Sequence, residues 1–379
     1  MNVLYRISII IYVFVNALFI YKYGYRQNYV NPLLLVFIYS IFIFGLFFLK
    51  QKNIVLIKND KKYKYIYIGI IIISTIIFSF IVFNIDGDNL NVDRWSALEI
   101  TVESIINGQY PYTRLDHMGQ MTSNFPALGF IALPFYYLGD VGYLQVFVYI
   151  IFSVYLYKST SIRTALFINL LYLFSPALLW EIAVKSDLVS NIMLVILFIQ
   201  YWKRKHNNIL EKPILLGGVL TFLLLTRGIV VIPLIIFFFK DLLISKFNVK
   251  IKFIISSVIF GIIISSPILF TVPNWNTLIN YNPLVIQTNK APIFSYILLI
   301  LTFVIPFLVK NRNNYNFYIA IIIFLIPFTA FVNSIIHNSW YSTIFEHKYD
   351  ISYLSMCLPP IIFWIKEYVE NKLDLKESI

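Results

Sequence analysis

Apolar residues occur along this chain in long runs separated by shorter polar connections, and these runs determine the expected fold. Twelve runs are candidates for membrane-spanning helices, although several fall short of the roughly 20 residues that a crossing needs. They lie at about residues 7–20, 32–49, 65–83, 142–157, 165–180, 188–202, 214–226, 228–239, 253–270, 293–309, 317–332 and 351–365. We therefore predict an all-α integral membrane protein with about 12 transmembrane helices (11 to 13), folded as a single polytopic membrane domain over residues 1–379.

Two segments modify this layout. Residues 126–138 (PALGFIALPFYYL) are apolar, but they are only 13 in number and include Pro134. We expect them to form a re-entrant or interfacial segment, because they are too short to span. Residues 214–239 contain Arg227 in an otherwise apolar sequence. As one helix they would place the basic clusters at residues 203–205 and 240–252 on opposite membrane faces. We therefore predict two short helices that meet at residues 226–228.

Composition and charge strengthen the membrane assignment. The chain is 59% hydrophobic and 13% charged, with a mean hydropathy of +0.78, whereas soluble proteins are roughly 45–50% apolar and about 25% charged. Its net charge of +12 comes from Lys and Arg residues that fall 22 on one set of alternate connections and 8 on the other. By the positive-inside rule the first set is cytoplasmic. We expect a plasma-membrane protein with both termini in the cytoplasm, and no nucleic-acid partner.

The first large outer loop, residues 84–141, contains the longest polar stretch and lies on the side that holds 11 of the 18 acidic residues. Its apolar and polar side chains alternate at helical spacing. The apolar positions are Trp95, Leu98, Val102, Ile105 and Ile106, and the polar ones are Arg94, Glu99 and Glu103. Gly108 followed by Pro111 is a stop signal. We predict an amphipathic helix at the outer membrane surface that begins at Asp93.

Asp93 has two interpretations. Asp is a favoured helix N-cap residue, which would give this side chain a structural role. Alternatively, a carboxylate held by the first turn of a rigid helix can act as a general base. Asp86 and Asp88 are competing carboxylates, although an Asp-Gly-Asp sequence is also typical of a solvated turn. No cofactor is expected, and a divalent metal held by Asp86 and Asp88 is the alternative.

The order of these features resembles the first outer loop of the GT-C glycosyltransferases, polytopic enzymes that use polyprenyl-phosphate sugars. The features are Asp93, the amphipathic helix, Gly108, Tyr110-Pro111-Tyr112, the segment PALGFIALP and Leu138-Gly139-Asp140. The resemblance implies that an acidic residue at the start of this helix is the catalytic base, which maps onto Asp93. Many members have a second acid at the next position, where this chain has Arg94. Weaker resemblances lie at residues 181–187, 217–227 and 347–359.

An inverting transfer from such a donor needs positive charge on the departing phosphate. The candidates are basic residues on the side where topology disfavours them, namely Arg227, Lys348, His347, Arg94 and Lys185. The structural alternatives are an ion pair of Arg227 with Asp187 or Glu181, snorkelling of Lys348 and His347, and neutralisation of Asp187 by Lys185. The candidate substrate-binding residues are Asp187, Glu181, Tyr110, Tyr112 and Asp88. An aromatic belt is the alternative for the two tyrosines.

These observations predict a glycosyltransferase that moves a sugar from a polyprenyl-phosphate donor to an extracytoplasmic glycan, glycolipid or protein. Two alternatives remain open. A lipid-linked oligosaccharide flippase or other transporter would have charged residues inside its spans, and apart from Arg227 the predicted spans are nearly free of charge. A polymerase of the O-antigen type is expected to have its large outer loop nearer the C-terminus.

Overall fold

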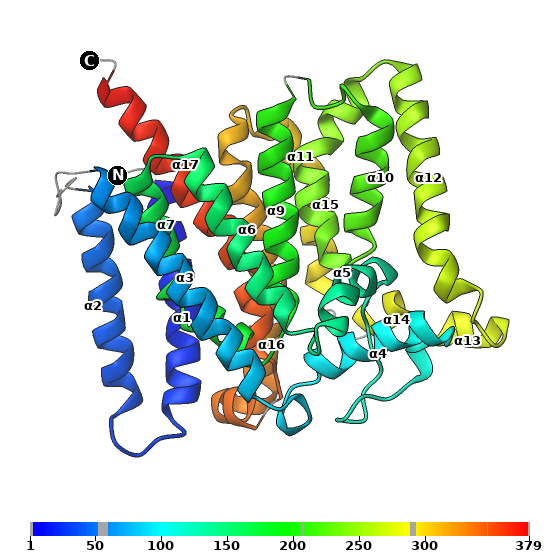
Figure 1. Cartoon of the computed structure of the whole chain (residues 1–379), viewed down its shortest axis with the longest axis horizontal. Helices are drawn as coiled ribbons and strands as arrows, with labels where there is room; N and C mark the ends of the chain where they lie inside the picture. Colours follow the sequence, from blue (N-terminus) through cyan, green and yellow to red (C-terminus); the bar gives the residue numbers. More distant parts are fainter. Residues whose placement is uncertain (1–2, 52–59, 207, 289–292, 347, 378–379) are drawn as a thin grey trace. The chain divides into compact units, whose positions relative to one another are not determined.

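A computed structural model describes residues 3–51, 60–206, 208–288, 293–346 and 348–377 (Figure 1). In this part of the chain the regular structure is helical, apart from an isolated antiparallel bridge between Leu115 and Met121. Each of the twelve apolar runs coincides with a helix or with two consecutive helices. The all-α class predicted from the sequence is therefore confirmed.

Five helical stretches in the described residues are long and apolar enough to cross a membrane, or up to six if one bent pair counts as a span. They are α1 (Val3–Gly24), α2 (Pro32–Gln51), α3 (Asp60–Asn84), α12 (Phe247–Leu269) and the stretch Arg312–Phe345, which contains η4 (Arg312–Asn314) and α16 (Tyr315–Phe345). The bent pair is α7 (Ile162–Leu173) and α8 (Pro176–Ala183), at 63°. The shorter apolar helices are α5 (Pro126–Tyr137), α6 (Tyr143–Ser159), α10 (Pro213–Leu224) and α15 (Ile293–Leu308).

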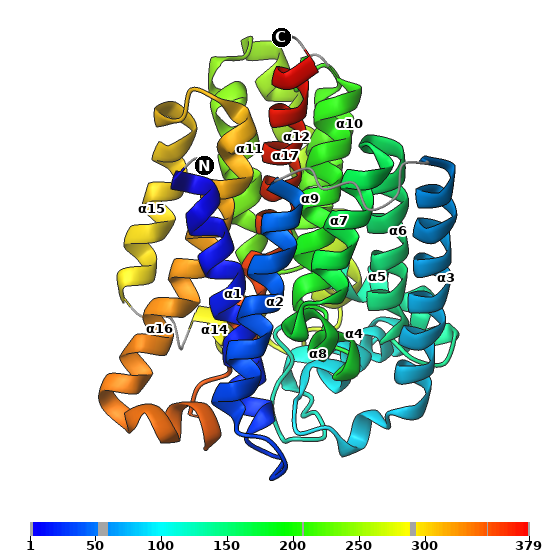
Figure 2. The same cartoon turned by 90° about the vertical axis from the view of Figure 1, so that its left-hand side faces the viewer.

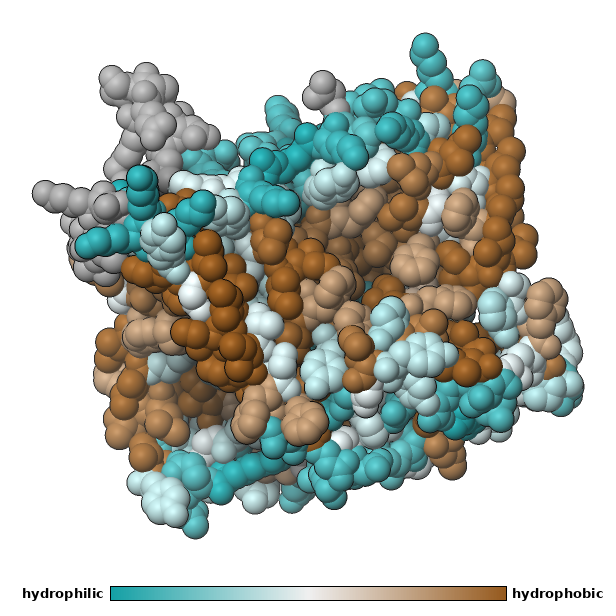
Figure 3. Space-filling model, in the orientation of Figure 1, coloured by the Kyte–Doolittle hydropathy of each residue, from teal (hydrophilic) through white to brown (hydrophobic). Residues whose placement is uncertain are grey.

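The remaining elements are more polar or shorter. The α-helices are α4 (Arg94–Asn107), α9 (Leu188–Lys205), α11 (Val231–Ile244), α13 (Trp275–Asn280), α14 (Pro283–Thr288) and α17 (Leu358–Glu377). The 3-10 helices are η1 (Gly87–Asn89), η2 (Pro111–Thr113), η3 (Gly228–Val230) and η5 (Ile351–Cys357). Large apolar side chains are exposed along α2 and α12, and Figure 3 shows hydrophobic surface over both helices. Such surface is typical of helices that face lipid.

The chain forms two compact units. Unit 1 consists of Met1–Ile77, Tyr149–Glu181 and Asn316–Ile379. In it α1 packs alongside α2, and α17 packs on α7 and α1 (Figure 2). The bend between α7 and α8 leaves backbone groups without helical partners, and Asn16 of α1 satisfies one of them. Its Oδ1 accepts hydrogen bonds from Ser175 Oγ at 2.6 Å and from the N–H of Ala177 at 3.1 Å.

Unit 2 consists of Phe78–Val148 and Ile182–Tyr315. In it α10 packs along α12 at short range, because Gly217 has no side chain at the contact. A Cβ atom there would lie 2.6 Å from the carbonyl oxygen of Phe253. Small residues allow membrane helices to approach closely in this way. Gly217 therefore has a packing role.

The break between α10 and α11 confirms the prediction of two short helices. Helix α10 ends at Leu224, η3 begins at Gly228, and Arg227 between them has extended backbone angles (φ −155°, ψ 145°). The start of α5 docks onto this break. The N–H groups of Phe125 and Ala127 donate to the carbonyl oxygens of Thr226 (3.2 Å) and Leu225 (2.9 Å). The exposed backbone of one helix break thus satisfies the first turn of a short apolar helix.

Helix α4 is the predicted amphipathic helix. Leu98 and Val102 are fully buried, and Gly108 ends the helix in the left-handed conformation (φ 61°), which glycine adopts without strain. The buried face packs on α5. One detail of the prediction is wrong, because Arg94 was assigned to the polar face but is only 7% exposed.

Candidate functional site

Charged side chains of unit 2 gather at the end that carries α4, which we call the acidic end. The turn after α5, the turn between α8 and α9, and the break between α10 and α11 meet there. Most of the residues singled out in the sequence belong to this end.

Asp93 immediately precedes α4, but it does not cap the helix. Its backbone is already helical (φ −76°, ψ −7°), and its side chain makes no capping hydrogen bond. The side chain is 40% exposed, and its Oδ1 lies 3.8 Å from Nε of the neighbouring Arg94. The structural explanation for an aspartate at this position therefore does not apply. The first turn of the helix holds an accessible carboxylate beside a buried guanidinium group.

His117, which was not predicted as a site residue, packs against the first turn of α4. Nε2 of His117 lies 2.8 Å from the carbonyl oxygen of Leu90, and its Nδ1 lies 2.6 Å from Ser96 Oγ. A carbonyl oxygen only accepts, so Nε2 carries a proton. Ser96 Oγ also lies 3.1 Å from the carbonyl oxygen of Asp93, so its single proton is shared between that oxygen and Nδ1 of His117. The Leu90 carbonyl thus fixes the tautomer of His117.

Asp116, in the same loop, is a second carboxylate near Asp93. Its Oδ1 accepts hydrogen bonds from the N–H groups of Met118 (2.8 Å) and Gln120 (2.9 Å). Its Oδ2 is buried and has no hydrogen-bond partner among the described residues. Burial raises the pKa of the Asp116 carboxyl, the two N–H groups oppose this shift, and the charge of Asp93 adds to it. The only sequence signal for this loop is the turn sequence Asp116-His117-Met118-Gly119.

Lys185 pairs with Asp140, and not with Asp187 as one interpretation of the sequence suggested. Its side chain is 2% exposed, its Nζ contacts Asp140 Oδ2, and it lies 5.5 Å above the ring of Trp95. Trp95 Nε1 donates to the other oxygen of Asp140 at 3.2 Å. Lys185 has a left-handed backbone (φ 55°), which is rare for a residue with a side chain and suggests a functional constraint.

Arg227 and Asp187 form a buried bidentate ion pair. Nε and Nη2 of Arg227 each lie 2.5 Å from an oxygen of Asp187, whose side chain is fully buried. The ion pair with Asp187, which was the structural alternative for Arg227, is therefore present. Both oxygens of Asp187 are occupied, while Nη1 of Arg227 has no hydrogen bond within the described residues. The Gln287 side chain accepts from the N–H of Gly228 (3.1 Å) and donates to the carbonyl of Ser123 (2.6 Å), which connects the helix break to the loop of residues 84–141.

Tyr110 and Tyr112 pack the loop of residues 84–141 against the rest of unit 2. Their rings meet edge to face, with centroids 5.2 Å apart, and pack on Ile268 in a buried cluster. The Tyr110 hydroxyl donates to the carbonyl of Tyr281 (2.6 Å), and the Tyr112 hydroxyl donates to that of Asn124 (2.9 Å). With rings buried and hydroxyls engaged, we assign both residues to the packing of the loop.

The remaining candidates lie elsewhere. Glu181 and Lys348 belong to unit 1. Glu181 is buried and accepts a hydrogen bond from Ser355 Oγ at 3.0 Å, whereas Lys348 is exposed. His347 lies outside the described residues. Asp88 of unit 2 is exposed in η1.

The Asp-Gly-Asp sequence forms a locally bonded turn. Asp86 Oδ1 accepts from the N–H of Asp88 (3.2 Å), and Oδ2 accepts from Asn89 Nδ2 (2.8 Å). In the described residues no group of three or more His, Cys, Asp or Glu side chains is arranged to hold a metal ion. The carboxylate oxygens of Asp86 therefore serve the turn.

Glu99, one turn after the start of α4, is the most perturbed carboxyl of the acidic end. Partial burial, together with the neighbouring carboxylates of Glu103, Asp140 and Asp88, raises the pKa of Glu99 to about 7. Like charges near a poorly solvated carboxyl disfavour its ionised form. This region of the loop therefore changes charge near neutral pH.

Comparison with other proteins identifies no relative, since no family model, no curated protein and no solved structure matches this chain.

Proposed function

We propose that this protein is a membrane glycosyltransferase of the GT-C type. It transfers a sugar, with inversion, from a polyprenyl-phosphate donor to a glycan, glycolipid or protein acceptor on the extracytoplasmic side of the plasma membrane. In this proposal the twelve apolar runs cross the membrane, with α5 as the re-entrant segment. Both termini are then cytoplasmic, and the acidic end of unit 2 faces outward.

Asp93 is the general base of the proposed reaction. It accepts the proton of the acceptor hydroxyl while that oxygen forms a bond to the anomeric carbon of the donor. The bond between this carbon and the phosphate oxygen breaks, and its electron pair leaves with the polyprenyl phosphate. The phosphate is a good leaving group, so that no general acid is needed, and cations stabilise the developing charge.

The observation that carries the proposal is that Asp93 is accessible and does not cap its helix. A carboxylate used as an N-cap would have its oxygens occupied by backbone N–H groups, whereas the side chain of Asp93 is 40% exposed beside Arg94. Arg94 is the nearest candidate for the donor phosphate. Arg227 retains Nη1 for a phosphate oxygen, and Asp187 orients its guanidinium plane.

The test is transfer of a sugar from a synthetic polyprenyl-phosphate donor by the full-length protein in membranes. Asp93→Asn keeps the shape of the side chain but removes the base, and we expect transfer to fall by about 10²- to 10⁴-fold. Asp86→Asn is the matched control, because it removes an exposed carboxylate of the same loop. Full transfer by folded Asp93→Asn would exclude Asp93 as the base, and loss of transfer in Asp86→Asn alone would assign the base to Asp86.

A second candidate is a transporter of lipid-linked oligosaccharides, which the helix breaks favour. The Arg227–Asp187 pair joins the break between α10 and α11 to the break between α8 and α9. Broken helices with buried charge are common at transporter substrate sites. A transporter would move a fluorescent lipid-linked sugar across a liposome membrane, and Asp93→Asn would leave that movement intact.

A further inference from the structure

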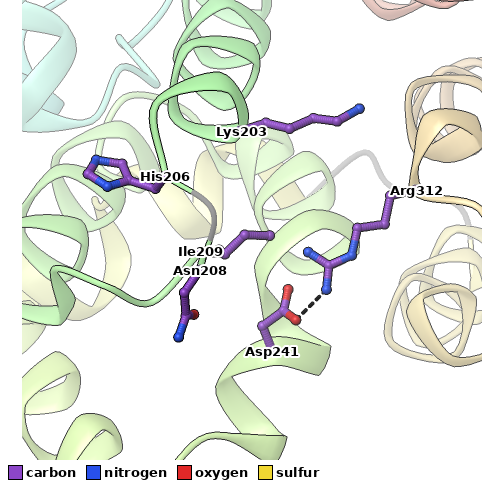
Figure 4. Close-up of a pocket in the computed structure, with 6 residues that line it drawn as sticks. All are labelled: Lys203, His206, Asn208, Ile209, Asp241 and Arg312. Carbon is purple, nitrogen blue, oxygen red and sulfur yellow. Dashed lines mark hydrogen bonds and ion pairs between the residues drawn. The ribbon is translucent and has the colours of Figure 1, made fainter.

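An open cavity of about 490 Å³ lies in unit 2, away from the residues described above (Figure 4). It is lined by Lys203, His206, Asn208, Ile209, Asp241 and Arg312. These residues come from the last turns of α9, the connection to α10, the C-terminal part of α11 and η4. Asp187 directly precedes the 18-residue helix α9, and Lys203 lies in its last turn. The length of the helix therefore separates the two residues by about 25 Å. The cavity therefore lies at the other end of unit 2, which we call the basic end.

Basic residues dominate this end. Residues 203–212, 240–252 and 310–312 contain ten Lys and Arg residues and two acidic ones. Both acids are paired, Asp241 with Arg312 and Glu211 with His206 Nδ1 at 3.0 Å. The potential in the cavity is therefore positive, and a concave site concentrates such a field.

The two cations of the cavity are held in place by neighbouring polar groups. Figure 4 shows Arg312 reaching toward Asp241 on α11, while Lys203 extends from α9. Lys203 Nζ donates to Asn313 Oδ1 at 2.9 Å, which places the ammonium group next to the residue that follows Arg312. A guanidinium group and an ammonium group from separate helices thus border one small opening.

We propose that this cavity binds a phosphate group. Arginine and lysine together are the usual ligands of phosphate oxygens. Basic pockets between transmembrane helices on the positively charged side of membrane proteins bind anionic lipid headgroups. The phosphate belongs either to such a headgroup or to a small soluble molecule, and the cavity volume suits a group of that size. This site is separate from the proposed transfer site, and its function does not depend on that proposal.

The experiment uses the full-length protein and two probes. Purified protein in nanodiscs of phosphatidylcholine with phosphatidylglycerol is analysed by native mass spectrometry for retained phosphatidylglycerol. In a parallel arm, inorganic phosphate is titrated against protein in nanodiscs of phosphatidylcholine alone, and thermal stabilisation is followed. We expect Lys203→Gln with Arg312→Gln to weaken retention or affinity by about tenfold or more, since two charge-assisted hydrogen bonds are lost.

Two further variants make the result decisive. Lys246→Gln with Lys250→Gln removes the same charge from the same end outside the cavity, and it should leave binding unchanged. Asp241→Asn keeps both cations and removes the competing carboxylate, so binding should tighten. Retention of phosphatidylglycerol without a response to phosphate identifies a lipid headgroup, and the reverse identifies a soluble ligand. Binding in neither arm, equal losses in the control pair, or weaker binding in Asp241→Asn would overturn the proposal.

Discussion

The two ends of unit 2 differ in the burial of their ion pairs and in the balance between cations and acids. At the acidic end two ion pairs are buried, Lys185–Asp140 and Arg227–Asp187, and the second has exposed side-chain fractions of 8% and 0%. At the basic end the Arg312–Asp241 pair is open, with fractions of 40% and 15%. Cations exceed acids at the basic end, whereas at the acidic end even Lys185 is buried against its carboxylate partner.

This difference distinguishes charges that set the orientation of a protein in the membrane from charges that form a functional site. Topology alone explains an excess of Lys and Arg on one side of a membrane protein. It does not explain the buried pairs of the acidic end, because removing ions from water is unfavourable unless geometry and hydrogen bonding compensate. The bidentate contact and the left-handed backbone of Lys185 indicate that the acidic end is organised for a function.

The largest expected effect on stability follows from breaking the buried pair. Asp187→Asn leaves the guanidinium group of Arg227 buried without its counter-charge, and we expect a loss of about 3–5 kcal/mol in the free energy of unfolding. The measurement is reversible unfolding in detergent followed by circular dichroism. Asp241→Asn makes the same chemical change in the exposed pair and should lose no more than about 1 kcal/mol. Equal losses would remove the contrast between the two ends.

A smaller effect tests the strained backbone at the acidic end. Lys185→Ala and Lys185→Gly both remove the ion pair with Asp140, but only glycine adopts a positive φ without steric cost. The glycine variant should therefore be the more stable of the two by about 1 kcal/mol. Thermal unfolding of the two variants under identical conditions measures this difference. If alanine were the more stable replacement, the left-handed conformation of Lys185 would be contradicted.

The sequence predicted those parts of the fold that depend on local pattern. Apolar runs located the helices, Gly108 located the end of α4, and the charge of Arg227 located the break between α10 and α11. These signals act within a few residues of their effect. For the same reason the Arg227–Asp187 contact could be stated only as one of two pairings, because 40 residues separate the partners.

The contacts of the site depend on how distant segments meet, and the sequence did not specify them. Lys185 was considered a partner of Asp187, two residues away, but it pairs with Asp140 at a separation of 45 residues. Asp116 and His117 were not selected as site residues, because their relation to the first turn of α4 arises from the folding of the loop. Asp93 was selected from its position at the start of the predicted helix, and only the geometry removes its capping role.

The smallest effect concerns the pH dependence of the acidic end. Glu99 has a folded-state pKa of about 7, above its ordinary value of 4.5. Below about pH 4.5 the Glu99 carboxyl is protonated in both the folded and the unfolded state, and it does not change the free energy of unfolding. Between about pH 4.5 and pH 7 the carboxyl is ionised in the unfolded state but still protonated in the folded state, so the free energy of unfolding falls as pH rises. Above about pH 7 the carboxyl is ionised in both states and the loss is constant. Glu99→Gln should match the original protein at pH 4 and be more stable at pH 8.

Solvent screens part of this effect because Glu99 is only partly buried, so we expect a gain below about 1 kcal/mol. Thermal unfolding of both proteins from pH 4 to pH 8 measures it. Glu103→Gln is the control on the same helix. Its carboxylate lies 2.7 Å from Nη2 of Arg114, so its removal should lower stability at pH 8. If Glu99→Gln gave the same difference at every pH, the charge of Glu99 would play no part, and crowding of carboxylates would not distinguish the acidic end from the basic end.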